Sequence, residues 1–322
     1  MPRKIEISHK TIIFTVLFLL FLWFLYAIRD ILLQIFVALL LMAILNPLVG
    51  RLSKFKVPRG LSVILSYLVI FGVLGGVIAV LVPPLVEQTT GFVNSLPKYL
   101  SNLGVDRFAS GEMVAQLLSQ LGSVPNQIVK AGVSLFANII NVIMVLIFAF
   151  YLLLVREKLG EHLLNLFGEE KTKSIVKVIG LMETKLGGWA RGQFLLMLLV
   201  GVANYLGLVL LGIPYALPLA ILAGLFEIIP YLGPTIAAIP AVVLGFSLSP
   251  LMGLATLALV FLIQQLENYV FVPRVMEKSI GVSPVIILFA LAVGFRLAGI
   301  VGVIISIPVI ITLQVIIKEY VV

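Results

Sequence analysis

Three charged residues stand almost alone in the apolar C-terminal half of the chain: Glu227, Glu267 and Arg296. Glu227 is the one charged residue between positions 192 and 266, and Arg296 is the one between 279 and 317. A charge at the centre of a bilayer costs about 2.5–3.5 kcal/mol on insertion scales, so it usually faces a cavity or a partner. Glu227 is therefore a candidate for binding a proton, a cation or a polar substrate.

Glu227 and Arg296 each also allow a structural interpretation. Glu227 could cap a water-exposed helix tip or pair with Arg296, which is its natural counter-charge. Arg296 could instead bind an anionic or oxygen-rich ligand, or extend its guanidinium to the membrane surface. The sequence leaves these alternatives open.

A second group of polar residues interrupts an otherwise apolar segment. Gln264, Glu267 and Asn268 are spaced i, i+3 and i+4, which places them on one helical face. Such a face turns toward other helices or a water path. Glu267 could carry a proton, or could lie only about 9 Å from the cytoplasmic end of its helix as an interfacial residue. Gln193 and Asn204 are further candidates, as hydrogen-bonding residues between helices.

Several kinds of chemistry are absent from the sequence. There is no cysteine, and the two histidines, His9 and His162, lie in charged segments. This excludes disulfides, cysteine–zinc sites and a histidine base within the membrane. No H-E-x-x-H, G-x-S-x-G or phosphate-binding loop motif occurs. We therefore expect no enzyme, no metal site, no cofactor and no transporter powered by its own ATP hydrolysis.

The composition defines the class of protein that must position these residues. Of the 322 residues, 61% are hydrophobic and only 11% are charged, with a mean hydropathy of +1.22. Soluble domains are about 45–50% apolar and about 25% charged. The sequence therefore predicts an all-α, polytopic helical membrane protein. We expect no nucleic-acid partner, because membrane orientation accounts for the net charge of +8.

Charge-free runs define the expected spans, and basic residues define their orientation. Runs at 12–28, 31–50, 61–86 and 131–155 approach the length of about 20 residues that crosses a bilayer. The first run is longer than most signal-peptide cores and lacks an A-x-A cleavage site, so we expect a retained span. Most of the 22 basic residues fall where the positive-inside rule puts both termini in the cytoplasm.

Two interruptions in the C-terminal half predict re-entrant hairpins. Residues 230–234 (Pro-Tyr-Leu-Gly-Pro) separate the apolar arms 216–229 and 235–248. Arms of about 14 residues rise roughly 21 Å, less than the roughly 30 Å hydrocarbon core. Residues 294–299 divide the segment 284–317 in the same way. Ordinary kinks or surface loops are the alternative interpretation.

Each expected hairpin follows a full span, at 192–211 and at 251–272. The two spans run in opposite directions, so the unit of span and hairpin is repeated with inverted topology. Inverted repeats with broken helices that meet near the midplane are typical of secondary transporters.

The expected organisation has five parts. Residues 1–86 form N-terminal spans that serve as scaffold and oligomer contact. Residues 87–130 form an external polar segment with a short helix at 113–121, and residues 131–155 form another span. Residues 156–190 form a cytoplasmic amphipathic segment, either on the membrane surface or as a solvated connector. Residues 191–322 form the transport unit.

A series of short motifs runs through this unit. They are Gly192-Gln193, the block from Phe226 to Pro234, Ile239-Pro240, the block from Gln264 to Asn268 with Pro273, Ser283-Pro284, the block from Gly299 to Gly302, and Pro308. Their order and spacing over positions 190–317 resemble the family of autoinducer-2 exporters (AI-2E). The N-terminal spans agree with this family in number and placement but carry no sharp motif.

The resemblance implies a bacterial inner-membrane protein of about eight membrane segments. It implies an exporter of a small solute such as autoinducer-2, coupled to a cation gradient, or alternatively a Na⁺(Li⁺)/H⁺ antiporter. It also implies a homo-oligomer, such as a pentamer, with elevator-like motion. A channel and a membrane scaffold are remote alternatives, and a scaffold would tolerate the loss of all three isolated charges.

We assign the following residues to the expected substrate or ion path: Gln193, Glu227, Pro230, Gly233, Pro234, Gln264, Glu267, Asn268 and Arg296.

Overall fold

The described part of the chain folds into α-helices. The computed structural model describes residues 9–102, 139–276 and 283–320, and every regular element in these ranges is helical. The elements are α1 (His9–Ala27), α2 (Arg29–Lys54), α3 (Arg59–Asn102), α6 (Ile139–Val155), α7 (Leu159–Phe167), α8 (Glu169–Leu210), α9 (Ala216–Phe226), α10 (Leu232–Leu248), α11 (Pro250–Leu266), the π-helical turn η2 (Glu267–Phe271), α12 (Val272–Met276) and α13 (Pro284–Tyr320).

Within the described ranges, five helical segments are long and apolar enough to cross a membrane. They are α2, α3, α8, the segment Pro250–Met276 that joins α11 to α12, and α13. Helices α6 and α7 together make a sixth candidate, bent by 76°, whereas α1, α9 and α10 are apolar but shorter. The prediction of an all-α polytopic membrane protein is confirmed.

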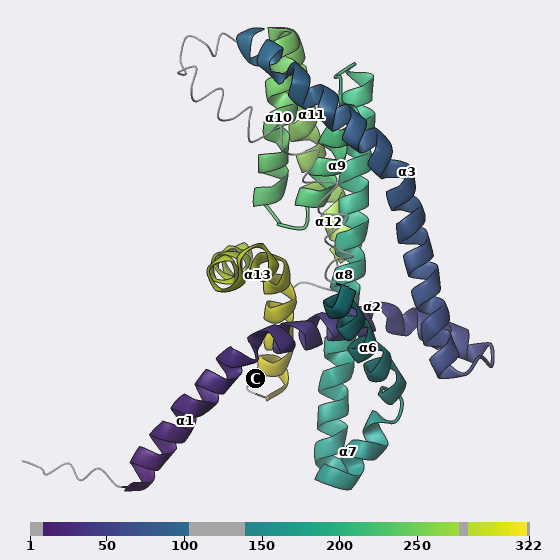
Figure 1. Ribbon diagram of the computed structural model, residues 1–322, viewed down its shortest axis with the longest axis vertical. Coiled ribbons are helices and arrows are strands. Elements are labelled where there is room, and N and C mark those ends of the chain that lie inside the picture. The colour runs from purple at the N-terminus through teal and green to yellow at the C-terminus, as the bar shows by residue number, and fades with distance from the viewer. Residues whose placement is uncertain (1–8, 103–138, 277–282, 321–322) are drawn as a thin grey trace, which may run out of the picture.

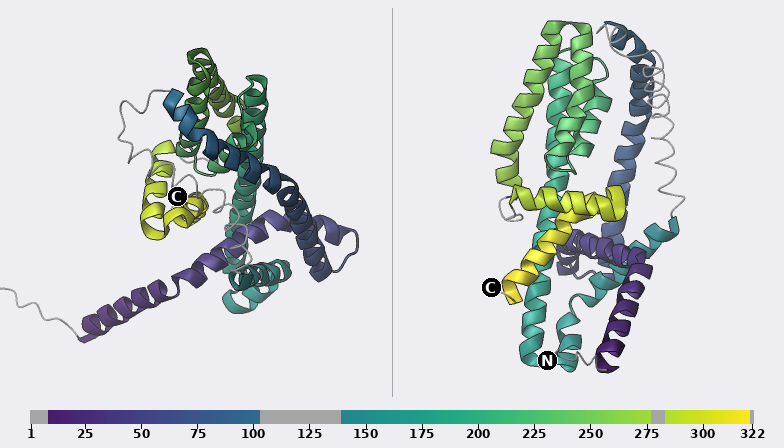
Figure 2. Two further views of the ribbon diagram at one scale, coloured as in Figure 1. Left: turned by 45° about the horizontal axis from the view of Figure 1, so that its top comes forward. Right: turned by 90° about the vertical axis from the view of Figure 1, so that its left-hand side faces the viewer.

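Helix α8 contacts helices from both ends of the chain: α2, α7, α9, α11, α12 and α13. Helices α9, α10 and α11 lie along one half of α8, and α2, α6 and α7 lie near its other half (Figure 1). Helix α3 begins beside α2 and α6 and reaches α10 at its far end, as the turned views of Figure 2 also show. The order of span, hairpin, span and hairpin that the sequence predicts is present as α8, α9–α10, α11–α12 and α13.

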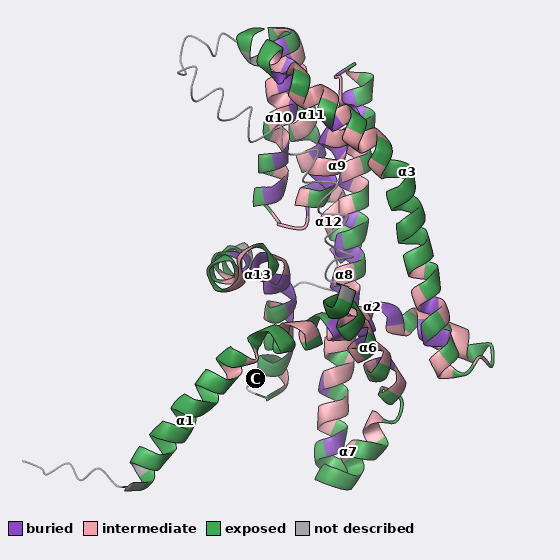
Figure 3. Ribbon diagram, in the orientation of Figure 1, coloured by how far each residue is buried: buried purple, intermediate pink, exposed green. Residues whose placement is uncertain are grey.

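Buried apolar side chains form three clusters. One joins α8 to α2, α12 and α13, a second joins α8 to α9 and α10, and a third joins α2, α3 and α6. By contrast, α1 and the middle of α3 expose apolar side chains along their length (Figure 3). Surfaces of this kind are stable when lipid or another subunit covers them.

Both expected hairpins are pairs of adjacent helical arms. The first is α9 and α10, which contact each other along their length. In the second, α13 reverses at Gly299, whose φ of 58° and ψ of −138° are accessible to glycine. The Ser306 hydroxyl of one arm donates a hydrogen bond of 2.9 Å to the Ala290 carbonyl of the other. A Cβ at Gly294 would overlap the Gly302 oxygen, so the arms meet through their backbones.

Two helices continue past the expected boundaries. Helix α8 joins the predicted cytoplasmic segment 156–190 to the predicted span at 192–211, because an apolar face that includes Leu186, Trp189 and Leu196 runs through both and is buried. Helix α3 extends beyond position 86 to Asn102 and includes three prolines, each of which removes one helical hydrogen bond. The predicted helix at 113–121 lies outside the described residues.

Candidate functional site

The first part of the site is the break between α9 and α10. Helix α9 ends at Phe226, and Glu227 is its C-terminal cap. Pro230 lacks a backbone donor, and Tyr231 adopts φ 67° and ψ −47°, outside helical geometry. Because a Cβ at Gly233 would overlap the Phe226 carbonyl oxygen, the first turn of α10 can close against the end of α9 only with glycine at this position.

The second part of the site is a π-helical turn in the following span. Helix α11 ends at Leu266, and the N–H of Val272 bonds to the carbonyl of Glu267, five residues earlier. Pro273 has no N–H, and its ring would clash with a carbonyl one α-turn before it. The wider π-turn accommodates this proline, and the helix continues as α12 to Met276. Such single π-turns are frequent at functional sites.

The two breaks bring two carboxyl groups together. Glu227 and Glu267 are 3% and 6% exposed, and their side chains lie within hydrogen-bonding reach of each other. The Oε2 atom of Glu227 is buried and receives no hydrogen bond from a described N–H or O–H group. Two carboxyl groups can share a hydrogen bond only when one of them carries a proton. The pair can therefore hold a proton, or a cation in its place.

Helix α8 fixes the position of the first carboxyl group. The Gln193 amide is buried, and its Nε2 donates a hydrogen bond of 2.7 Å to the backbone oxygen of Glu227. This bond satisfies a carbonyl that the end of α9 leaves without a helical partner. Asn204 lies about three turns further along α8. Its side chain donates to the Val200 carbonyl of the same helix at 2.9 Å and does not pair with Gln193.

A cavity of about 320 Å³ opens beside the carboxyl pair. Gln193, Glu227, Glu267 and Asn268 supply its polar groups, and Tyr231 lies at the helix break. Its apolar walls are Leu196, Val272, Pro273, Met276, Ile287 and Ile307. Pockets of this size, with apolar walls and a few convergent polar groups, are typical of small-ligand sites.

A smaller cavity of about 20 Å³ lies on the other side of Glu267. Asn204, Gln264 and Glu267 contribute polar side chains, and Gln264 hydrogen-bonds to Glu267. This volume corresponds to about one water molecule. The described residues contain no group of three or more His, Cys, Asp or Glu side chains that could hold a metal, so the oxygen atoms available here are those of carboxylates and amides.

The structure brings most of the expected path residues together. Gln193, Glu227, Pro230, Glu267 and Asn268 line the larger cavity, whereas Pro234 and Gln264 line the smaller one with Glu267. Gly233 closes the first break. Arg296 is exposed on α13, and no ion pair of the described residues joins it to Glu227. The partner of Glu227 is instead a second acid.

Sequence reasoning missed the residues that form the rest of the wall. Tyr231 lies within the Pro-Tyr-Leu-Gly-Pro break, so its position between two prolines was an available signal. Ile287 and Ile307 come from the two arms of α13. Nothing distinguishes these two isoleucines from the many other apolar residues of that segment.

A multi-pass helical membrane protein with a cavity beside two buried carboxyl groups, between broken helices, has the architecture of a transporter. The family model described as "AI-2E family transporter" matches residues 12–322, and the chain belongs to this family.

Named relatives align along most of their lengths. The chain is 30% identical over 295 residues to the "Putative transport protein YueF" of Bacillus subtilis, covering 85% of this chain and 79% of the relative. It is 25% identical over 296 residues to YrrI of the same organism, covering 87% and 84%. It is 24% identical over 303 residues to YhhT of Escherichia coli, covering 88% and 83%. YrrI and YhhT are also each named "Putative transport protein".

Proposed function

We propose that this protein is a secondary transporter of the bacterial inner membrane that works by alternating access. In this proposal the Glu227–Glu267 pair exchanges a proton with a cation, and the adjoining cavity of about 320 Å³ holds the transported solute. The solute is a small molecule such as autoinducer-2, exported at the expense of a cation gradient. The proposal assigns the protein no catalytic activity.

The buried carboxyl pair is the observation that carries the proposal. A carboxylate buried without a partner is strongly unfavourable. Two carboxyl groups that face each other can share one proton, but the loss of that proton leaves two negative charges in one apolar pocket. A cation can then replace the proton. Competition of this kind at one buried site couples the movement of one ion to that of another.

The helix breaks support alternating access. Each carboxyl group lies where its helix departs from α geometry, at the end of α9 and in η2. Broken helices that meet at a cavity are the structural basis of rocking or elevator-like motion in secondary transporters. We propose that residues 191–322 form the moving unit and that residues 1–86 form the scaffold.

The N-terminal helices support an oligomer. Helix α1 and the middle of α3 expose apolar side chains that a second copy of the chain could cover (Figure 3). We propose a homo-oligomer, such as a pentamer, that uses these helices as its contact. The distribution of basic residues supports cytoplasmic locations for both termini.

Na⁺(Li⁺)/H⁺ antiport without an organic solute is a second candidate function. The carboxyl pair favours it, because carboxylate and amide oxygens alone suffice to bind a small cation. The volume of the larger cavity and its six apolar wall residues favour an organic solute instead.

Ion flux in liposomes tests the proposal. The purified protein is reconstituted, a sodium gradient is imposed and the internal pH is recorded, for the wild type, for Glu267→Gln and for Glu170→Gln. The last variant is a matched control, because Glu170 is an exposed carboxylate at the start of α8. We expect sodium-driven proton movement in the wild type and the control, and its loss in Glu267→Gln.

The other outcomes are equally informative. Proton movement that survives in Glu267→Gln would keep antiport but remove Glu267 from it. If neither the wild type nor the two variants moves protons, organic solutes become the candidate substrates, and autoinducer-2 is the first one tested. A current that grows in proportion to the gradient without saturation would indicate a channel and would contradict alternating access.

A further inference from the structure

A third cavity lies at the corner where α6 bends into α7, and none of its lining residues belongs to the two cavities beside the carboxyl pair. The two helices meet at 76°, and the cavity between them and the start of α3 has a volume of about 430 Å³. Its lining residues are of two kinds, which we call the polar side and the apolar side of the cavity. The polar side consists of Arg59, Glu157, Lys158 and His162.

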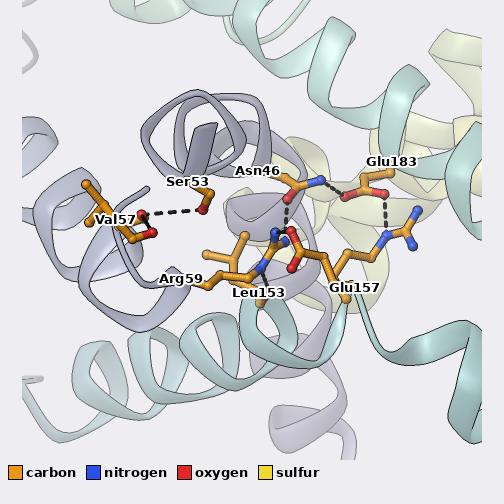
Figure 4. A network of polar contacts seen from close by, with 9 residues as sticks. Asn46, Ser53, Val57, Arg59, Leu153, Glu157 and Glu183 are labelled. Carbon is orange, nitrogen blue, oxygen red and sulfur yellow. Dashed lines mark hydrogen bonds and ion pairs between the residues drawn. The ribbon is translucent and has the colours of Figure 1, made fainter. Parts of the chain in front are cut away.

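The Arg59 guanidinium forms a fixed part of the polar side. Its Nε donates to the Leu153 carbonyl at 2.7 Å, one terminal nitrogen donates to Asn46 Oδ1 at 3.0 Å, and the other pairs with Glu157 (Figure 4). Asn46 in turn donates to Glu183 of α8 at 2.6 Å. These bonds tie the start of α3 to α2, α6 and α8, so the guanidinium has little freedom to move.

Two nitrogen-bearing side chains of the cavity, Lys158 and His162, are available to a ligand. Lys158 and His162 are exposed, and neither forms an ion pair in the described part of the chain. Nδ1 of His162 lies 2.8 Å from the Lys158 carbonyl and is the donor there. Nε2 therefore carries no hydrogen bond in the described part of the chain, and it can donate to an anion when the ring is protonated. The one carboxylate of the cavity, that of Glu157, is already paired with Arg59. The cavity therefore offers nitrogen groups without enough acidic partners, which suits an anion.

The apolar side of the cavity continues toward the hydrocarbon of the membrane. Tyr151, Leu154 and Val155 form it, and they are the last turn of the apolar helix α6. Just beyond the bend, α7 is an amphipathic helix with no buried residue, and its Leu166 and Phe167 are 75% and 51% exposed. A short amphipathic helix with exposed apolar residues, next to the end of a span, is typical of a segment that lies in the membrane interface.

We propose that this corner binds an anionic phospholipid, with the phosphate at Lys158 and His162 and the acyl chains along Tyr151, Leu154 and Val155. Basic pockets between helices at the membrane surface bind anionic lipid headgroups. A free phosphate would use only the polar side and would leave the apolar side without a role. The volume of about 430 Å³ is sufficient for a glycerophosphate headgroup and the first carbons of its chains.

Lipid-dependent stability tests this inference. The melting temperature of the detergent-purified protein is measured with added phosphatidylglycerol, phosphatidylcholine or glycerol 3-phosphate. The variant carries Lys158→Gln and His162→Gln, which leave the Arg59 network intact. Lys318→Gln is the matched control, because Lys318 is an exposed lysine in the last turn of another apolar helix, α13.

We expect phosphatidylglycerol to raise the melting temperature of the wild type and the control, and phosphatidylcholine to have little effect. In the double variant, the concentration of phosphatidylglycerol needed for half of the shift should rise roughly tenfold. Native mass spectrometry should also find less phosphatidylglycerol bound per chain in the double variant than in the control. This second measurement does not depend on the stability of the variant.

Three results would overturn the inference. The first is an equal response of the double variant and the control to phosphatidylglycerol. The second is an equal response of the wild type to both phospholipids. The third is an equal shift with glycerol 3-phosphate and with phosphatidylglycerol, which would assign the site to a free phosphate ester instead of a lipid.

Discussion

Replacing the Glu227 carboxylate by an amide should separate stability from transport. In the wild type, Oε2 of Glu227 is buried without an N–H or O–H donor, and the Glu267 carboxyl group lies beside it. The amide of Glu227→Gln can donate an N–H to the Glu267 carboxylate and needs no proton to do so. We therefore expect this variant to be more stable than the wild type and to lose proton-coupled transport.

The size of the effect follows from the contacts of the carboxyl pair. A hydrogen bond to a charged group contributes about 1.5–3 kcal/mol, and a buried polar atom without a partner costs about 1–3 kcal/mol. We expect the variant to gain ~1.5–3 kcal/mol under alkaline conditions, where both wild-type carboxyl groups are ionised and repel each other. The gain should decrease as the pH falls, because a protonated carboxyl group then provides the donor.

The assay combines melting temperatures over a pH series with proton flux in liposomes. Glu183→Gln is the control. Glu183 receives hydrogen bonds from Asn46 at 2.6 Å and from Arg156 at 2.7 Å, and it is not part of the Glu227–Glu267 pair. Removal of its charge should lower stability and leave proton coupling intact. The reasoning is refuted if Glu227→Gln is less stable than the wild type at alkaline pH, or if it transports protons at the wild-type rate.

Two further predictions concern the groups that hold the carboxyl pair in place. Gln193→Leu removes the buried hydrogen bond to the Glu227 carbonyl. It should therefore cost about 1–3 kcal/mol of stability and raise the sodium concentration for half-maximal flux. A variant with unchanged stability would show that this bond is dispensable. Gly233→Ala places a Cβ against the Phe226 carbonyl oxygen, so the break must open and flux should fall severely while the amount of protein in the membrane stays normal. Wild-type flux in Gly233→Ala would contradict the close packing of this turn.

The break between α9 and α10 and the reversal within α13 could be predicted from the sequence, whereas the π-turn at Glu267–Phe271 was not. Pro230 and Pro234 lack backbone donors, and Gly233 and Gly299 tolerate conformations or contacts that other residues do not. These are local properties, which a sequence displays directly. The continuity of α8 could not be predicted in the same way, because it depends on an apolar face that only becomes buried when α2 and α13 pack against it.

The pairing of the two acids could not be predicted from the sequence. Glu227 and Glu267 are 40 residues apart, and no spacing rule relates two helix breaks in different spans. Electrostatic reasoning offered Arg296 as one possible partner of Glu227, since opposite charges attract. In the structure the partner of Glu227 is Glu267, because α8 packs against α9 and the Gln193 side chain holds the backbone of Glu227 where its carboxyl group faces η2.

The backbone around the two acids argues that the pair binds a ligand instead of serving stability alone. Tyr231 adopts a φ of 67°, and the chain from Glu267 to Phe271 forms a π-turn. The φ of Tyr231 costs about 1–3 kcal/mol and persists only where the surrounding structure determines it, and π-turns are frequent at functional sites. A pair of like charges adds a further cost, whereas an apolar pair of similar volume would stabilise the same contact. Since both costs occur at one cavity, the arrangement is best explained by a site that is organised in advance for a proton or a cation.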